Sequence, residues 1–141
     1  MRKQPKETAV FTFYNANPLN KRVGDCVIRA LSLTPGYDWW KVYHELCDYG
    51  ETECCTPTDD EAWDAFLKKH KYKRYKMPRK ADRKLYTLAE FVKSDLIKDD
   101  DIVVVSICGH LTCVKGRKVH DTWDCSEYTV RRYYKYEAVT V

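Results

Sequence analysis

The amino-acid sequence predicts an α+β protein, with helices in the earlier part of the chain and a sheet of antiparallel strands at its end. Up to about residue 98, apolar side chains recur at helical spacing behind capping sequences. Beyond that point, β-branched and aromatic residues gather in short runs separated by turns. Because helices and strands are segregated along the chain, α+β is favoured over an alternating α/β fold.

The first predicted elements are a short strand and a short helix. Residues 9–14 alternate apolar and polar side chains, which is typical of a strand, and residues rich in turn formers follow. Asp25 is then a suitable N-cap for a helix that begins with Cys26 and stops before Pro35-Gly36.

Three more helices are expected before the sheet. Asp38 opens the second helix, which we expect to end at Gly50. Residues 58–61 and 87–90 are both capping-box sequences, in which a Thr is followed three positions later by Glu. They predict the starts of the third and fourth helices.

The sheet follows after Lys98. Residues 102–107 are apolar and mostly β-branched, which indicates a buried strand. Residues 111–114 and 119–123 are expected to form a hairpin around Lys115-Gly116, because Gly supplies the positive φ that a tight turn needs. Residues 128–137, rich in Tyr, are the last predicted strand.

The composition indicates one globular domain. The 141 residues contain no repeat, linker or low-complexity tract, so we expect a single domain over residues 1–141 with a flexible basic tail at 1–8. Hydrophobic residues make up 44% and charged residues 33%, which excludes a disordered chain. No apolar run is long enough to cross a bilayer, and no signal sequence is recognisable. We therefore expect a cytoplasmic protein with no membrane partner.

Positive charge is concentrated in residues 68–84, although the net charge of the whole chain is only +4. A solvated surface is the favoured interpretation of this basic run. The alternative is a surface that binds an acidic protein or a nucleic acid, and of these two we do not expect nucleic acid. The oligomeric state is left open.

The seven cysteines raise the question of a metal site. His44, Cys47, Cys54 and Cys55 offer four donors within a short span. A vicinal cysteine pair suits one tetrahedral ion poorly, and the usual C-x2-C spacing is absent. We therefore expect no metal and no cofactor, and the role of Cys54-Cys55 stays open.

Three residues together indicate nucleophilic catalysis. Cys26 stands at the start of a helix, where amide donors favour the reactive thiolate. His110 opens a strand next to a buried one, in ordered apolar surroundings that suit a general base. An acid beside this histidine would fix its tautomer and leave the other ring nitrogen basic.

The hairpin register selects the acid. If Lys115 and Gly116 are the two turn residues, Asp121 lies directly opposite His110 and on the same face of the sheet. A shifted turn would instead place Trp123 opposite His110. Asp124 is therefore kept as the alternative acid.

These residues resemble the papain-like superfamily of cysteine peptidases, in which a Cys on an early helix is followed by His and Asp or Asn on adjacent strands. Asp25-Cys26 is similar to the Asp-Cys that begins the catalytic helix of bacteriocin-processing peptidases. The sequence most closely resembles a small phage- and prophage-encoded branch, from about Tyr14 to Tyr134. The motifs that carry this resemblance are GDCVIRAL at 24–31, GHLT at 109–112 and DTWDC at 121–125.

The resemblance implies a papain-like fold, with the Cys26 helix packed on an antiparallel sheet, and hydrolysis of an amide bond through a thioester. Asn20 occupies the position, six residues before the nucleophile, where the family carries a Gln that helps to bind the oxyanion. Trp123 corresponds to the Trp of papain's Asn-Ser-Trp triplet, which shields the hydrogen bond of the histidine from water.

The resemblance also implies a protein or peptide substrate, cleaved at a peptide, isopeptide or side-chain amide, in the host-cell cytoplasm if the chain is phage-encoded. Transfer to an amine instead of water is equally compatible with this chemistry. The alternative function is a papain-like protein that has lost catalysis and binds a protein or nucleic-acid partner through its basic surface.

Overall fold

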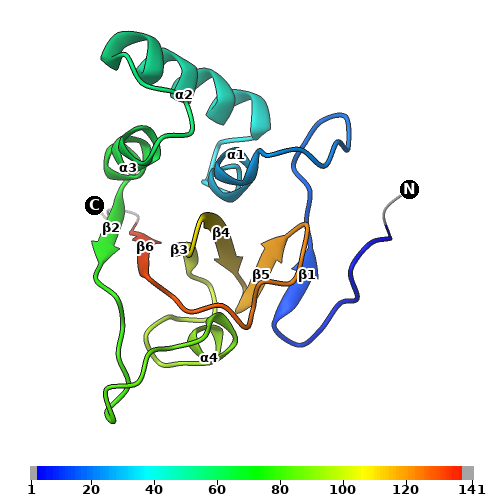
Figure 1. Cartoon of the computed structure of the whole chain (residues 1–141), viewed down its shortest axis with the longest axis vertical. Helices are drawn as coiled ribbons and strands as arrows, with labels where there is room; N and C mark the ends of the chain where they lie inside the picture. The colour runs from blue at the N-terminus through cyan, green and yellow to red at the C-terminus, as the bar shows by residue number, and fades with distance from the viewer. Residues whose placement is uncertain (1–2, 138–141) are drawn as a thin grey trace.

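The structure, a computed structural model, describes residues 3–137 as four helices and six strands (Figure 1). Residues 1–2 of the predicted tail lie outside the described residues. The elements are β1 (Phe11–Phe13), α1 (Cys26–Leu31), α2 (Trp39–Glu53), α3 (Asp60–Lys69), β2 (Tyr72–Tyr75), α4 (Leu88–Val92), β3 (Ile102–Ile107), β4 (His110–Lys115), β5 (Lys118–Asp121) and β6 (Arg132–Tyr136). The predicted α+β class is confirmed.

All six strands form one sheet in the order β1-β5-β4-β3-β6-β2. The prediction of an antiparallel sheet is confirmed for the five strands from β5 to β2. It is wrong for β1, which runs parallel to β5. The edge strand β2, inside the basic run, was not predicted; it pairs with β6 and leaves Lys73 and Arg74 exposed.

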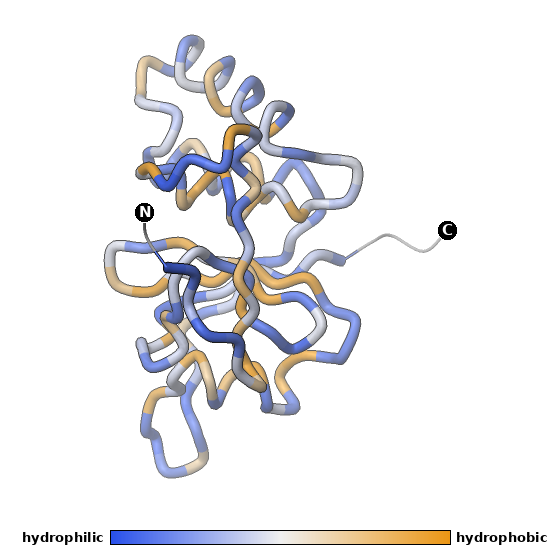
Figure 2. Tube along the Cα trace, turned by 90° about the vertical axis from the view of Figure 1, so that its right-hand side faces the viewer, coloured by the Kyte–Doolittle hydropathy of each residue, from blue (hydrophilic) through white to orange (hydrophobic). Residues whose placement is uncertain are grey.

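Helices cover both faces of the sheet, with α1, α2 and α3 on one side and α4 on the other (Figure 1). Val104 of β3 packs into the core beneath α1–α3, whereas Val103 and Val105 pack into the core against α4. Because this strand is buried on both faces, its sequence is a continuous apolar run. In Figure 2, α2 at the top alternates hydrophobic and hydrophilic residues, as expected for a helix with one buried face.

Two predicted helix ends are wrong. The second helix does not end at Gly50, since α2 continues to Glu53. A Cβ at Gly50 would lie 2.5 Å from the carbonyl oxygen of Cys55, so this glycine allows the chain to fold back closely against the helix. The capping box predicted at 58–61 does not form, because α3 begins at Asp60 and its N-cap Asp59 makes no side-chain cap.

The capping box at 87–90 is confirmed at the start of α4. Thr87 accepts a hydrogen bond from the backbone of Glu90, and the Glu90 side chain accepts one from the backbone of Thr87.

The hairpin between β4 and β5 turns one residue later than predicted. Lys115 pairs with Lys118, so the turn residues are Gly116 and Arg117. Both have positive φ, +59° and +57°, the conformation that a two-residue type I′ turn requires at its two central positions. Thr112, rather than His110, therefore occupies the position opposite Asp121 when the register is extended from the paired residues.

Part of the predicted N-terminal tail is hydrogen-bonded. The carboxylate of Glu7 accepts hydrogen bonds from the backbone N–H of Phe13, at 2.5 Å, and from the hydroxyl of Thr12, at 2.6 Å. Within residues 3–137, no helix combines the length and apolar composition needed to span a bilayer.

Candidate active site

The N-terminal end of α1 meets the loop between β3 and β4 at a cavity of about 330 Å³. Cys26, the first residue of α1, and His110, the first residue of β4, both line this cavity. Thr58, just before α3, and Asp60 and Trp63 of α3 also line it. The structure thus brings the predicted nucleophile and the predicted base to one concave surface.

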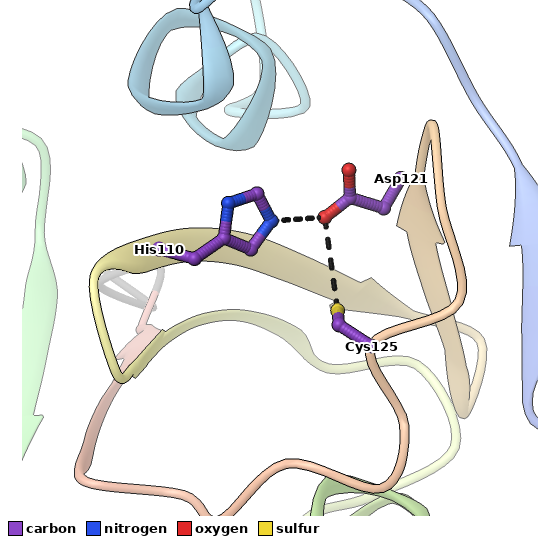
Figure 3. Close-up of side chains that lie close together, drawn as sticks. All are labelled: His110, Asp121 and Cys125. Carbon is purple, nitrogen blue, oxygen red and sulfur yellow. Dashed lines mark hydrogen bonds and ion pairs between the residues drawn. The ribbon is translucent and has the colours of Figure 1, made fainter.

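The third predicted residue, Asp121, ends β5 and is only 2% exposed. Nε2 of His110 donates a hydrogen bond to Oδ2 of Asp121 at 2.7 Å (Figure 3). The predicted contact therefore forms although the predicted register is wrong. His110 and Thr112 lie on the same face of β4, and diagonal neighbours across a sheet remain within reach of long side chains.

Figure 3 also shows where the second ring nitrogen of His110 points. Nδ1 faces away from Asp121, toward the side on which α1 lies. Cys26 begins α1 and lines the same cavity as His110, which lowers the pKa of its thiol. The imidazole therefore stands between the thiol and the carboxylate.

The pKa of Cys26 is lower than that of an ordinary thiol. Burial raises this pKa, but the hydrogen bond from His110 and the backbone N–H of Leu111 outweigh burial. The positive charges of His110 and Arg29 lower the pKa further. These contacts favour the thiolate, the nucleophilic form of cysteine.

The pKa of His110 changes in the opposite direction. Burial alone would lower it, but hydrogen bonds to Asp121, Cys125 and Cys26 raise the pKa of His110 to about 11. Burial also raises the pKa of Asp121, but the hydrogen bond and charge of His110 more than compensate, so the pKa of this carboxyl lies below its usual value. The two shifts move the Cys26–His110 pair toward thiolate and imidazolium, beside an aspartate whose ionised form is favoured.

The other predicted site residues are placed differently. The ring of Trp123 lies 5.0 Å from the ring of His110, beside the hydrogen bond that it was predicted to shield. Asp124 is exposed and accepts a hydrogen bond from the backbone of Ser126, so the structure brings Asp121 rather than Asp124 to the imidazole. Asn20 is exposed, has a φ of 56° and does not line the cavity.

Sequence reasoning missed three further residues of the site, which are Asp25, Arg29 and Cys125. Asp25, Arg29 and Asp121 are the only buried charged residues in the described part of the chain, and Arg29 contacts both acids. Cys125 is buried, and its Sγ lies 3.8 Å from Oδ2 of Asp121, to which the thiol can donate (Figure 3). The spacing of Asp25 and Arg29 on one helical turn was a usable signal for their ion pair, but nothing in the sequence indicated that both would be buried.

His110, Asp121 and Cys125 are also the only group of three metal-ligating residues within residues 3–137. Their donor atoms lie within 4.8 Å of one another, but Asp121 is already fully engaged. Oδ1 accepts from Arg29 at 3.2 Å and from the backbone N–H of Thr122 at 2.7 Å, while Oδ2 accepts from His110. A cation here would displace these donors and lie close to a buried guanidinium, so the cluster suits a positioned imidazole better than a metal.

The other metal ligands considered from the sequence do not form such a group. His44 stacks on the indole of Trp40, with ring centroids 6.1 Å apart. All seven cysteines of the chain are free thiols.

Comparisons with known proteins give this arrangement no relative: no family model, no curated protein and no solved structure matches the chain.

Proposed function

We propose that the protein is a cysteine hydrolase that cleaves amide bonds, with Cys26 as nucleophile, His110 as acid–base catalyst and Asp121 as the residue that orients the imidazole. The observation that carries this proposal is the position of His110. Its Nε2 is bound to a buried carboxylate and its other nitrogen faces the helix of a cysteine whose pKa is lowered. A nucleophile, a base and an orienting group in this arrangement are what acyl transfer requires.

The reaction would proceed in two steps. The Cys26 thiolate attacks the carbonyl carbon, and His110 gives its proton to the departing amine nitrogen, which leaves an acyl thioester on Cys26. In the second step His110 removes a proton from water, the water oxygen attacks the thioester, and the carboxylic acid departs as the thiolate is restored.

The backbone N–H of Cys26 is one candidate to stabilise the oxyanion, because the first amides of a helix have no acceptor within the helix. Asn20 as a second donor stays a prediction. Since Asn20 is exposed and outside the cavity wall, that role requires the loop before α1 to turn inward when substrate binds.

We also propose that the architecture is papain-like and that the substrate is a protein or peptide. A Cys helix packed on a sheet that carries the His and the Asp on adjacent antiparallel strands supports this architecture. The cavity of about 330 Å³ is large enough for one or two side chains beside the scissile bond.

The proposal is tested by the pH dependence of thiol alkylation. Iodoacetamide is applied between pH 5 and 9, and the modified cysteines are mapped by mass spectrometry. Cys26 should react readily at pH 6, whereas the exposed Cys108 serves as an internal control that should follow an ordinary thiol, with a midpoint near ~8.5. If Cys26 is no more reactive than Cys108 at pH 6, the catalytic proposal is wrong and a binding role through the basic surface becomes the better hypothesis.

Labelling with peptide-based electrophiles then identifies the substrate class. Cys26→Ala should abolish both labelling and turnover while leaving the circular dichroism spectrum unchanged. Turnover that survives this substitution would exclude Cys26 as the nucleophile.

A further inference from the structure

Arg29 is a charged residue in the interior, with only 5% of its surface exposed. It lies on α1, three residues after Cys26. Its Nη1 donates to the carboxylate of Asp25 and to the carbonyl oxygen of Val23, the latter at 3.3 Å. Its Nη2 donates to Oδ1 of Asp121 at 3.2 Å. One guanidinium therefore joins the helix of the nucleophile to the strand of the acid.

The two oxygens of Asp121 have different partners. Oδ1 accepts from Arg29, and Oδ2 accepts from Nε2 of His110 at 2.7 Å. Rotation of the carboxylate about its bond to Cβ would break both contacts together. The orientation of the imidazole is thus coupled, through Asp121, to the helix on which Cys26 stands.

The buried charges around Arg29 make its contact with Asp121 important for stability. Asp25 is 3% exposed and Asp121 2% exposed, and two buried carboxylates are costly without a shared cation. Asp25 has further donors in the indole N–H of Trp39, at 2.9 Å, and the amide of Asn17, at 3.3 Å. The other titratable groups near Arg29 are Cys26, whose pKa its charge lowers, His110 and Cys125, at the far oxygen of Asp121, and Tyr14, whose hydroxyl bonds to Ser32.

We propose that Arg29 is a positioning residue of the active site, which holds the Asp121 carboxylate, and through it the His110 ring, at a fixed place relative to Cys26. This inference rests on the proposed function. It also explains why the residue is an arginine: a planar guanidinium can serve carboxylates on two different elements at once, whereas the single nitrogen of a lysine cannot hold both in this geometry.

The test compares Arg29→Met and Arg29→Lys with Arg117→Met. Arg117 is a matched control, because it is also tied into the fold, by hydrogen bonds to the carbonyls of Val92, Ser94 and Ile97, but it lies away from the cavity. For each protein, the rate of Cys26 alkylation is measured against pH, together with the melting temperature.

Arg29→Met should move the midpoint of Cys26 alkylation upward by about one pH unit, since a nearby cation is lost and the imidazole is no longer held in place. Arg29→Lys retains a cation and is the variant to use if Arg29→Met does not fold. It should move the midpoint in the same direction by a smaller amount. Arg117→Met should lower the melting temperature and leave the midpoint unchanged.

The outcomes separate this inference from the proposed function. If the folded Arg29 variants lose thermal stability but keep the wild-type midpoint, Arg29 serves only the fold and the inference is overturned. If wild-type Cys26 itself titrates like Cys108, the proposed function fails before the variants are considered.

Discussion

Two histidine–carboxylate pairs in this molecule have almost the same geometry. His110 lies 2.7 Å from Asp121, and His70 lies 2.6 Å from Glu45. Each histidine also has an aromatic ring close by: Trp123 at 5.0 Å from His110, and Tyr37 at 4.8 Å from His70. The histidine–carboxylate distance and the nearby aromatic ring therefore do not distinguish the two sites.

The surroundings of the two pairs differ. The side chain of Asp121 is only 3% exposed and is held by Arg29. The side chain of Glu45 is 23% exposed, and its second oxygen accepts a hydrogen bond from the hydroxyl of Tyr37. His110 lowers the pKa of the Cys26 thiol, while His70 and Glu45 belong to no group of three metal-ligating residues within residues 3–137. The His70–Glu45 pair joins the end of α3 to α2, which is a structural role. A thiol at the second nitrogen and a fixed carboxylate distinguish the candidate active site.

The comparison is tested most strongly by removing each histidine. His110→Ala should reduce the rate of Cys26 alkylation at pH 6 by roughly 100-fold, because a thiol with an ordinary pKa is only about 0.3% ionised at that pH. His70→Ala should lower the melting temperature without changing this rate. Equal losses of reactivity in the two variants would mean that His110 acts only through the stability of the fold.

Replacing the carboxylates should have a smaller effect. Asp121→Asn should slow peptide turnover by roughly 10-fold or more, because the amide cannot stabilise the imidazolium as a carboxylate does. It should also lower stability by about 1–3 kcal/mol, since the buried Arg29 loses the negative charge of one of its two carboxylate partners. Asp124→Asn and Glu45→Gln are the controls, and both should retain wild-type turnover. A greater loss from Asp124→Asn would identify Asp124 as the orienting acid.

Local sequence signals predicted the parts of this site that depend on local structure. The helix that starts at Cys26, the buried strand 102–107 and the capping box at Thr87 are all present. Asp25 is the N-cap residue as predicted, but its side chain makes no cap hydrogen bond. The approach of Asp121 to His110 was predicted from an incorrect turn. The predicted contact forms despite this error because residues two positions apart on a strand lie on the same face of the sheet.

The features that the sequence did not predict depend on distant contacts. The parallel pairing of β1 with β5 has no local signature, and the turn at Gly116-Arg117 requires a positive φ at an arginine. Arg29 contacts Asp121 across 92 positions of sequence, so its burial could not be inferred from its helix alone. The exposed position of Asn20 likewise depends on the path of its loop, which spacing from Cys26 does not determine.

The smallest expected effect concerns the pH dependence of stability, which should distinguish the charged Cys26–His110 pair from an uncharged one. The pKa of His110, raised by folding to about 11, stabilises the protein fully below its unfolded value near ~6.5, and this contribution is lost as the pH rises. The lowered pKa of Cys26 contributes in the opposite sense: its stabilisation is complete above ~8.5 and is lost as the pH falls.

Between these limits the folded ion pair and the unfolded neutral pair carry the same number of protons, so this pair should give the wild-type protein a flat stability profile from about pH 6.5 to 8.5. Cys26→Ala leaves only the contribution of His110, so its free energy of unfolding should fall with rising pH by up to about 1.4 kcal/mol per unit relative to wild type. Urea unfolding across this range measures the difference, with the exposed Cys108→Ala as a control that should parallel wild type. Parallel profiles for Cys26→Ala and wild type would show that Cys26 is a neutral thiol in the folded protein, and His110–Asp121 would then be a structural pair like His70–Glu45.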